Sequence, residues 1–171
     1  AIKYTVGASA YGYRGLGDVF VFIFFGLLAV LGTMFLFTKS ISLTAVLPAV
    51  SIGALSAAVL NLNNLRDHES DKASNKNTLV VKMGFEKGKV YHTFLIAIGL
   101  ISLLVYLILE YQCYFQLLPL IVFIPIVLQL KRVVKTGDPS SLDPELKVLA
   151  ISIFFLSLLF YLGNNIFCNF G

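Results

Sequence analysis

A run of acidic and amide side chains directly follows a long apolar stretch. It spans residues 61–72 and reads Asn-Leu-Asn-Asn-Leu-Arg-Asp-His-Glu-Ser-Asp-Lys. If the preceding helix continues through it, Asp67 and Asp71 lie one turn apart on the same face. Carboxylate and amide oxygens are the ligands that Mg²⁺ prefers, usually together with phosphate oxygens of a substrate. The run therefore predicts a site for Mg²⁺ and a phosphate-bearing molecule.

A pair of carboxylates at a helix end also has an ordinary structural explanation. Acidic, amide and basic side chains are common where a span leaves the bilayer, and two Asp residues four positions apart often occur by chance. The surrounding pattern is more specific than the pair. The run comes directly after a span, and the stretch Lys-Asn-Thr-Leu-Val-Val-Lys-Met-Gly follows at residues 76–84. We therefore interpret the whole pattern as a functional site.

The elements that must position this run are membrane helices. Hydrophobic residues make up 58% of the 171 residues and charged residues 13%, whereas soluble domains are about 45–50% apolar and about 25% charged. The net charge of +4 is no sign of nucleic-acid binding, because the basic residues gather in segments between apolar stretches. We predict an all-α, multi-pass transmembrane bundle that forms a single domain over residues 1–171.

Five apolar stretches are long enough to cross a hydrocarbon core of about 30 Å. They cover approximately residues 19–37, 43–62, 90–109, 115–130 and 146–167, with a long polar loop at 63–89. Small residues between 51 and 58 predict close helix packing. Pro119 and Pro125 predict a bend in the fourth span. Asp143 and Pro144 predict the start of the last helix, with Asp143 as its cap.

The basic residues predict an orientation. All but one of the 13 Lys and Arg residues fall in segments on the same side of the membrane, the exception being Lys39. The positive-inside rule therefore places loop 63–89 in the cytoplasm and the C-terminus outside.

Cys113 and Cys168 lie near the outer ends of predicted spans. Two isolated cysteines argue only weakly for a disulfide, and we interpret them as small apolar residues. We interpret His92 as an interfacial histidine and not as a ligand.

The run at 61–84 resembles the second aspartate-rich motif of the UbiA-type intramembrane prenyltransferases. Within that family, other stretches resemble the branch that prenylates 1,4-dihydroxy-2-naphthoate in menaquinone biosynthesis. They are Tyr-Thr-Val-Gly at 4–7, Tyr-Gly-Tyr-Arg-Gly-Leu-Gly-Asp at 11–18, the apolar span that follows it, and Leu-Asp-Pro-Glu-Leu-Lys at 142–147. The resemblance covers essentially the whole chain.

The resemblance implies a nine-helix fold of which this chain is the C-terminal part. Family members carry a first motif of the form Asn-Asp-x-x-Asp-x-x-x-Asp several helices upstream, and the sequence contains no such motif. The chain also begins with Ala1 and not with Met. We therefore expect it to be part of a longer protein, to carry half of a site, and to be inactive alone.

The resemblance also implies an activity and roles for individual residues. A polyprenyl group would move from its diphosphate to 1,4-dihydroxy-2-naphthoate, with loss of CO₂, in the plasma (inner) membrane of a bacterial cell. With Mg²⁺ as the cofactor, its ligands would be Asp67, Asp71 and Asn64. The catalytic residues would be Asp67, Asp71 and Arg66, although Arg66 can instead pair with either carboxylate. The remaining substrate contacts would come from Asn63, Asn64, Lys72, Lys76, Arg14 and Tyr13.

Two alternatives stay open at this point. The first is a prenyltransferase of the same family with another acceptor, such as hydroxybenzoate or a haem or chlorophyll precursor. The second is a transporter or a non-catalytic scaffold. Transporters usually place ionisable groups or broken helices near the bilayer midplane, and no predicted span carries a charge well inside it. Divalent-metal-dependent binding of a prenyl diphosphate would separate an enzyme from a scaffold.

Overall fold

The computed structural model describes residues 15–169, which form helices joined by short turns, without a strand in that range. Within it, five helical stretches are long and apolar enough to cross a membrane. They are Gly17–Thr38, Val46–Arg66, Phe85–Leu109, Tyr114–Lys135 and Pro139–Ile166. The predicted multi-pass helical membrane protein with five spans is thus confirmed.

Three of the five spans combine different helix types. The first consists of α2 (Gly17–Val21), the π-helix η2 (Phe22–Leu28) and α3 (Ala29–Thr38). The fourth consists of the 3₁₀ helix η3 (Tyr114–Val122) and α8 (Phe123–Lys135). The fifth consists of η4 (Pro139–Leu142), α9 (Asp143–Tyr161) and η5 (Leu162–Ile166), with the short η6 (Phe167–Asn169) after it. The second and third spans are the α-helices α4 (Val46–Arg66) and α7 (Phe85–Leu109).

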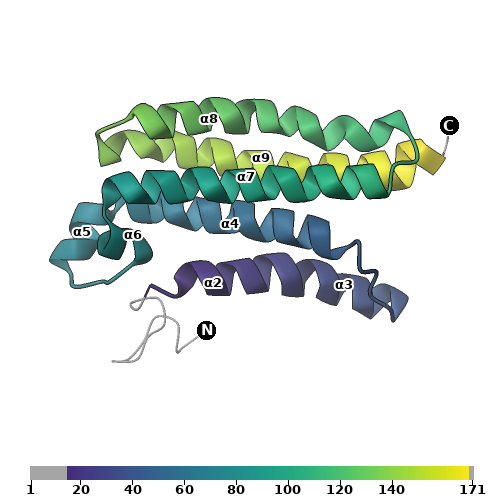
Figure 1. Ribbon diagram of the computed structural model, residues 1–171, viewed down its shortest axis with the longest axis horizontal. Helices are drawn as coiled ribbons and strands as arrows, with labels where there is room; N and C mark the ends of the chain where they lie inside the picture. Colours follow the sequence, from purple (N-terminus) through teal and green to yellow (C-terminus); the bar gives the residue numbers. More distant parts are fainter. Residues whose placement is uncertain (1–14, 170–171) are drawn as a thin grey trace.

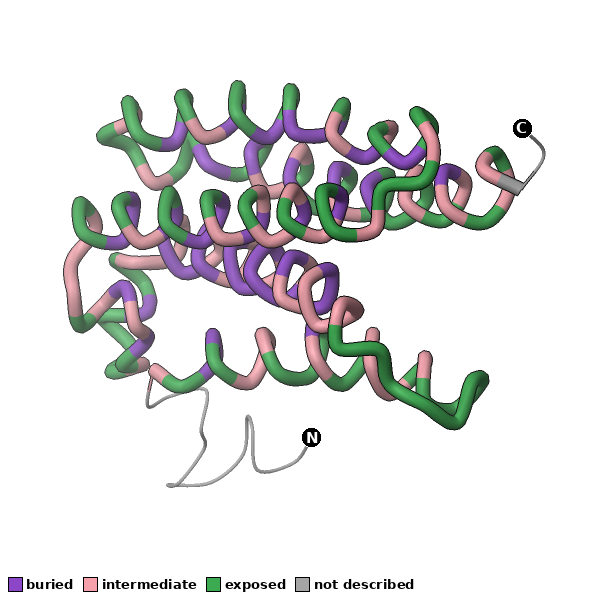
Figure 2. Tube along the Cα trace, turned by 45° about the vertical axis from the view of Figure 1, so that its right-hand side comes forward, coloured by how far each residue is buried: buried purple, intermediate pink, exposed green. Residues whose placement is uncertain are grey.

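Helix α4 is the centre of the bundle. It packs against α7 and α9, and the first span lies along its other side (Figure 1). Half of the apolar stretch of α4 is buried, against 6% for the first span. Figure 2 shows the buried residues gathered along α4 and on the faces of α7, α8 and α9 that meet. The segment that carries the acidic run therefore continues directly from the span with the largest buried share among the five described.

Small residues allow α4 and α7 to approach closely, as the sequence predicts. Ser51 Oγ donates a hydrogen bond to the Gly99 carbonyl at 2.7 Å, and Asn61 Nδ2 donates one to the Gly88 carbonyl at 3.1 Å. A Cβ on Gly99 would lie 2.9 Å from Leu55 Cγ. Polar side chains that reach the backbone of a neighbouring helix fix the two helices in one register.

The predicted polar loop at 63–89 is largely helical, so that prediction was wrong. α4 continues to Arg66, two short helices follow as α5 (His68–Ala73) and α6 (Leu79–Met83), and α7 begins at Phe85. Thr78 caps α6, because its Oγ1 accepts a hydrogen bond from the Val81 N–H at 3.3 Å. Gly84, at φ +86°, separates α6 from α7. Local capping thus orders a segment that has no long apolar stretch.

The early start of α7 also corrects the interpretation of His92. This residue lies about two turns inside the helix and is fully buried, with its Nε2 3.4 Å from Gln129 Nε2 on α8. It is a core residue and not an interfacial one. In the fourth span, the part that contains Pro119 is 3₁₀-helical.

The two cysteines form a disulfide between Cys113 and Cys168, with their Cα atoms 5.8 Å apart, so their interpretation as small apolar residues was wrong. Cys113 precedes η3 and Cys168 lies in η6, at the end of the bundle opposite α5 and α6. Next to the disulfide, Gln116 Nε2 donates a hydrogen bond to Asn164 Oδ1 at 2.9 Å. The fold joins segments that are 55 residues apart, and sequence spacing does not reveal this pairing.

Candidate functional site

The acidic run lies where α4 gives way to α5. Asp67 stands between the two helices with φ −89° and ψ 6°. Its N–H still bonds to the Asn63 carbonyl at 2.9 Å, and the Asp71 N–H bonds to the Asp67 carbonyl at 2.8 Å. The helical hydrogen-bond pattern therefore continues through Asp67 and spaces the two carboxylates by one turn, as the sequence predicts.

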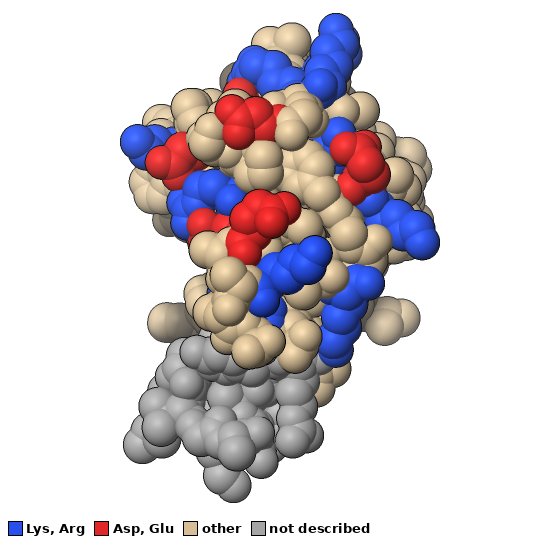
Figure 3. All heavy atoms as spheres, turned by 90° about the vertical axis from the view of Figure 1, so that its left-hand side faces the viewer, with Lys and Arg blue, Asp and Glu red and all other residues tan. Residues whose placement is uncertain are grey.

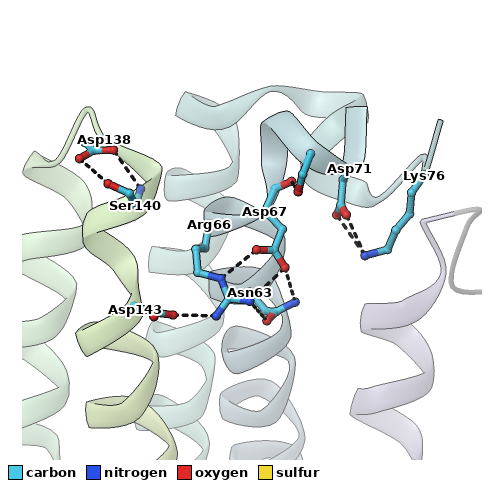
Figure 4. A network of polar contacts seen from close by, with 9 residues as sticks. Asn63, Arg66, Asp67, Asp71, Lys76, Asp138, Ser140 and Asp143 are labelled. Carbon is cyan, nitrogen blue, oxygen red and sulfur yellow. Dashed lines mark hydrogen bonds and ion pairs between the residues drawn. The ribbon is translucent and has the colours of Figure 1, made fainter. Parts of the chain in front are cut away.

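The Asp67 carboxylate is held by its neighbours on α4 (Figure 4). Arg66 donates from Nε to Oδ1 at 2.8 Å and from Nη2 to Oδ2 at 3.0 Å, and Asn63 Nδ2 donates to Oδ2 at 3.3 Å. The hydrogen bonds from Arg66 are the main reason that the pKa of Asp67 lies below its ordinary value of 3.8. Asp67 is therefore kept ionised.

The Asp71 carboxylate is buried and has a different cationic partner. Lys76 Nζ donates to Oδ1 at 3.0 Å and to Oδ2 at 3.1 Å. The chain returns to Asp71 through a turn in which Asn75 has a φ of +55°. The two carboxylates of the motif are thus each neutralised by a separate cation.

Arg66 also connects the motif to the last span. Its Nη1 donates to Asp143 Oδ1 at 2.7 Å, and its Nη2 donates to Asn63 Oδ1 at 2.8 Å as well as to Asp67. The prediction that Asp143 caps α9 was wrong, because Leu142 holds the cap position and Asp143 is the first residue of the helix. Its carboxylate contacts Arg66 instead. Sequence reasoning missed this contact, although the 142–147 stretch was one of the motifs that carried the family resemblance.

An open depression of about 500 Å³ lies over these residues. Its lining comes from the end of α4, from α5 and from the segment that leads into α9, namely Arg66, Asp67, Glu69, Asp138, Pro139, Ser140 and Asp143. Figure 3 views this end of the bundle and shows charged side chains of both signs gathered over it. A charged ligand can thus reach Arg66 and Asp67 from the aqueous side.

The other predicted site residues lie in different surroundings. Asn64 is buried in α4, and the hydrogen bond to Asp67 comes from Asn63. Lys72 is exposed, whereas Lys76 bonds to Asp71. Tyr13 and Arg14 lie outside the described residues. The predicted roles of these residues in binding remain predictions.

The carboxylate and amide oxygens of this motif fit a divalent metal whose other ligands come from a substrate and from water. Among residues 15–169, no group of three or more His, Cys, Asp or Glu side chains is arranged to hold a metal ion. Mg²⁺, however, is usually bound by one or two carboxylates together with phosphate oxygens and water. Asp67 and Asp71 supply two carboxylates of the required kind, and Asn63, which bonds to Asp67, supplies an amide oxygen.

The model of the UbiA prenyltransferase family matches residues 1–159. The chain is 40% identical over 163 residues to a protein of Haemophilus influenzae named 1,4-dihydroxy-2-naphthoate octaprenyltransferase, covering 95% of this chain and 53% of the relative. It is 39% identical to the protein of that name from Escherichia coli, over the same shares of both chains. The chain thus spans about half the length of these curated relatives.

A more distant relative carries a different name. The 2-carboxy-1,4-naphthoquinone phytyltransferase of Synechocystis is 29% identical over 147 residues, covering 85% of this chain and 48% of that protein. None of the solved structures matches this chain.

Proposed function

Since this chain belongs to the UbiA prenyltransferase family, we propose that it forms part of an intramembrane enzyme that prenylates 1,4-dihydroxy-2-naphthoate. The donor is a polyprenyl diphosphate and the product is the prenylated quinol, demethylmenaquinol, which is the reduced form of demethylmenaquinone. The observation that carries the proposal is the position of Asp67 and Asp71, one turn apart at the polar end of an apolar bundle. A substrate with an anionic head and a long apolar chain fits that arrangement, and the names of the relatives support the acceptor.

Each residue of the motif has a proposed task. Asp67 and Asp71 hold Mg²⁺, together with an amide oxygen from Asn64 or Asn63. When bound, the metal neutralises charge on the leaving diphosphate. Arg66 can bind two phosphate oxygens at once through its planar guanidinium group. Lys76 and Lys72 follow the motif closely and add positive charge near the same anion. Tyr13 and Arg14 remain proposed substrate contacts.

The apolar bundle has its own part in the reaction. The allylic C–O bond breaks and diphosphate leaves with the electron pair. An electron-rich ring carbon of the acceptor then forms the new C–C bond, and the carboxyl group leaves as CO₂. The allylic cation reacts with water if water reaches it, so the reaction needs a dry chamber. The interior of the membrane bundle, in a chain with 15 Phe and 8 Tyr, supplies such surroundings.

We further propose that the Asp67 end of the bundle faces the cytoplasm and the C-terminus the outside of the bacterial plasma membrane. Two independent features support this orientation. All but one of the Lys and Arg residues belong to the cytoplasmic side in this arrangement. The Cys113–Cys168 disulfide lies at the other end, and disulfides persist in oxidising compartments.

The site proposed here is half of a complete one. This chain contains one aspartate-rich motif. The relatives from Haemophilus influenzae and Escherichia coli are about twice as long as the part of them that this chain matches. We infer that helices outside these residues supply the opposing half, and that residues 1–171 alone are inactive.

The experiment that tests the proposal is prenyl transfer by the complete gene product that contains this chain, assayed in membranes. The assay supplies Mg²⁺, a polyprenyl diphosphate and 1,4-dihydroxy-2-naphthoate, with Asp67→Ala and Asp71→Ala in parallel. Mg²⁺-dependent formation of a prenylated naphthoquinol that both variants lose is the expected result. Transfer only to hydroxybenzoate or a tetrapyrrole precursor would change the acceptor. No transfer to any of them, or full activity of both variants, would overturn the proposal.

A further inference from the structure

Arg66 is shared between two carboxylates, one next to it in the sequence and one 77 positions away. Nε and Nη2 bond to Asp67, whereas Nη1 bonds to Asp143 at the start of α9. The side chain of Asp143 is 60% exposed, and exposed ion pairs usually contribute little to stability. The contact therefore needs an explanation other than stability, and the one that follows rests on the function proposed above.

Asp67 has little room for a metal while Arg66 holds it. A carboxylate has about four lone-pair positions. Three are taken, because Arg66 occupies one on each oxygen and Asn63 Nδ2 occupies a second on Oδ2. The one position left is on Oδ1, beside the positively charged guanidinium of Arg66, which repels a divalent cation. Binding of the cation to Asp67 therefore favours release of Arg66 from this carboxylate. An arginine that releases its only carboxylate partner would lose its charge compensation and its position.

Asp143 supplies a second anchor that this release does not disturb. It binds Nη1, the nitrogen of Arg66 that makes no bond to Asp67. It also approaches from a different helix, so its position is independent of the α4–α5 turn. Arg66 can therefore turn away from Asp67 and remain next to the depression, with donors free for phosphate oxygens.

We propose that Asp143 is a positioning residue: it keeps Arg66 at the site when Asp67 exchanges Arg66 for a divalent cation. Without this anchor, Arg66 pairs with Asp67 alone and competes more strongly with the cation. Loss of Asp143 therefore weakens divalent-cation binding, and it does so only while Arg66 is present.

The chain offers a matched control for the test. Asp138 lies in the same segment before α9 and lines the same depression, but its carboxylate accepts hydrogen bonds from the Ser140 N–H and Oγ and not from Arg66. Asp143→Asn and Asp138→Asn each remove one negative charge from this segment. Asp143→Glu keeps the carboxylate. Arg66→Gln, alone and combined with Asp143→Asn, completes a double-mutant cycle.

The measurement is the dissociation constant of Mn²⁺ with inorganic diphosphate, followed by electron paramagnetic resonance on the purified complete gene product. Asp143→Asn should raise this constant about two- to fivefold, which corresponds to the strength of an exposed ion pair. Asp138→Asn should leave it unchanged, and Asp143→Glu should largely restore it. In the Arg66→Gln background, Asp143→Asn should have no further effect.

The inference would be overturned by an equal effect of Asp138→Asn, or by an undiminished effect of Asp143→Asn in the Arg66→Gln background. Either would mean that Asp143 acts through general charge or through α9. A wild-type constant that Asp143→Asn does not change would overturn it as well. Failure of the proposed function is a separate result, because it is read from the absence of prenyl transfer by the wild-type protein.

Discussion

Asp67 and Asp71 are one helical turn apart, yet each carboxylate bonds to a different cation, Arg66 for the first and Lys76 for the second. Each carboxylate of the motif therefore has a cationic partner of its own, although Arg66 also pairs with Asp143. These pairs offset the charge of both carboxylates at the end of a membrane helix. They also imply that the two cations have separable effects on stability.

The first prediction concerns Lys76. In Lys76→Met the Asp71 carboxylate, whose side chain is 8% exposed, loses the ammonium group that bonds to both its oxygens. A charged group left unsatisfied in a buried position costs about 1–3 kcal/mol or more. We expect a lower thermal unfolding temperature in detergent without divalent cations, and partial recovery when Mg²⁺ and diphosphate are added.

Lys72→Met is the control for this prediction. Lys72 is the neighbour of Asp71 in sequence, but it is exposed and lies on the solvent side of α5. Its removal should change stability by less than about 0.5 kcal/mol. Equal losses in the two variants would show that net charge, and not the Asp71–Lys76 pair, determines the stability of the motif.

The second prediction is a pH dependence that comes from Arg66. Because Arg66 lowers the pKa of Asp67 in the folded state, the pair stabilises the protein above the ordinary carboxyl value of 3.8. This contribution disappears as the pH falls through the lower pKa of the folded state. Arg66→Gln should therefore reduce stability at neutral pH, and its difference from wild type should shrink below pH 3.8.

Unfolding temperatures measured from neutral pH down to about pH 2.5 test this prediction. The pH-dependent part of the difference should become smaller in an Asp67→Asn background, because that carboxylate no longer titrates. A difference that stays constant over the whole range would mean that Arg66 stabilises the protein through packing and not through an ion pair.

The sequence predicted those features that depend on neighbouring residues. Each span is an apolar stretch long enough for a bilayer, and lipid forces such stretches into helices. The spacing of Asp67 and Asp71 followed from helical periodicity, and the small residues of α4 do pack closely. The predicted start of α7 lies at the first strongly apolar residues, five positions too late. This shift is the reason that sequence reasoning places the buried His92 at the membrane interface.

The features that sequence did not predict depend on contacts between distant residues. Arg66 and Asp143 are 77 positions apart, and Cys113 and Cys168 are 55 apart. No rule of sequence spacing predicts either pair, because both contacts form only when the helices pack together. Asp143 illustrates this point: its position before Pro144 indicated a cap, whereas a basic side chain from another helix determined its actual partner.

The third prediction uses the disulfide to test the orientation. After mild reduction of intact cells, a membrane-impermeant maleimide should label Cys113 and Cys168 from outside. In a variant without these two cysteines, Ser140→Cys should be labelled only after the cells are opened, because Ser140 is exposed at the Asp67 end. Labelling of Ser140→Cys in intact cells would reverse the proposed orientation.

The last prediction concerns the crossing of the first two spans at Gly26 and Gly53. A Cβ on Gly26 would lie 2.5 Å from Gly53 Cα and 2.7 Å from the Ala49 carbonyl oxygen. Both atoms belong to the backbone of α4, so neither can rotate away. Gly26→Ala should therefore push the first span off α4 and cost about 1–3 kcal/mol, as overpacking usually does.

Gly32→Ala in the same span is the control for Gly26→Ala. A Cβ there would lie 3.7 Å from its nearest neighbour, Leu28 Cδ1, which is ordinary contact. Alanine favours helices over glycine by about 1 kcal/mol at both positions. Gly32→Ala should thus leave stability unchanged or raise it, while Gly26→Ala lowers the unfolding temperature in detergent. If both variants were equally stable, the close crossing would contribute nothing to the attachment of the first span, and lipid rather than α4 would determine its position.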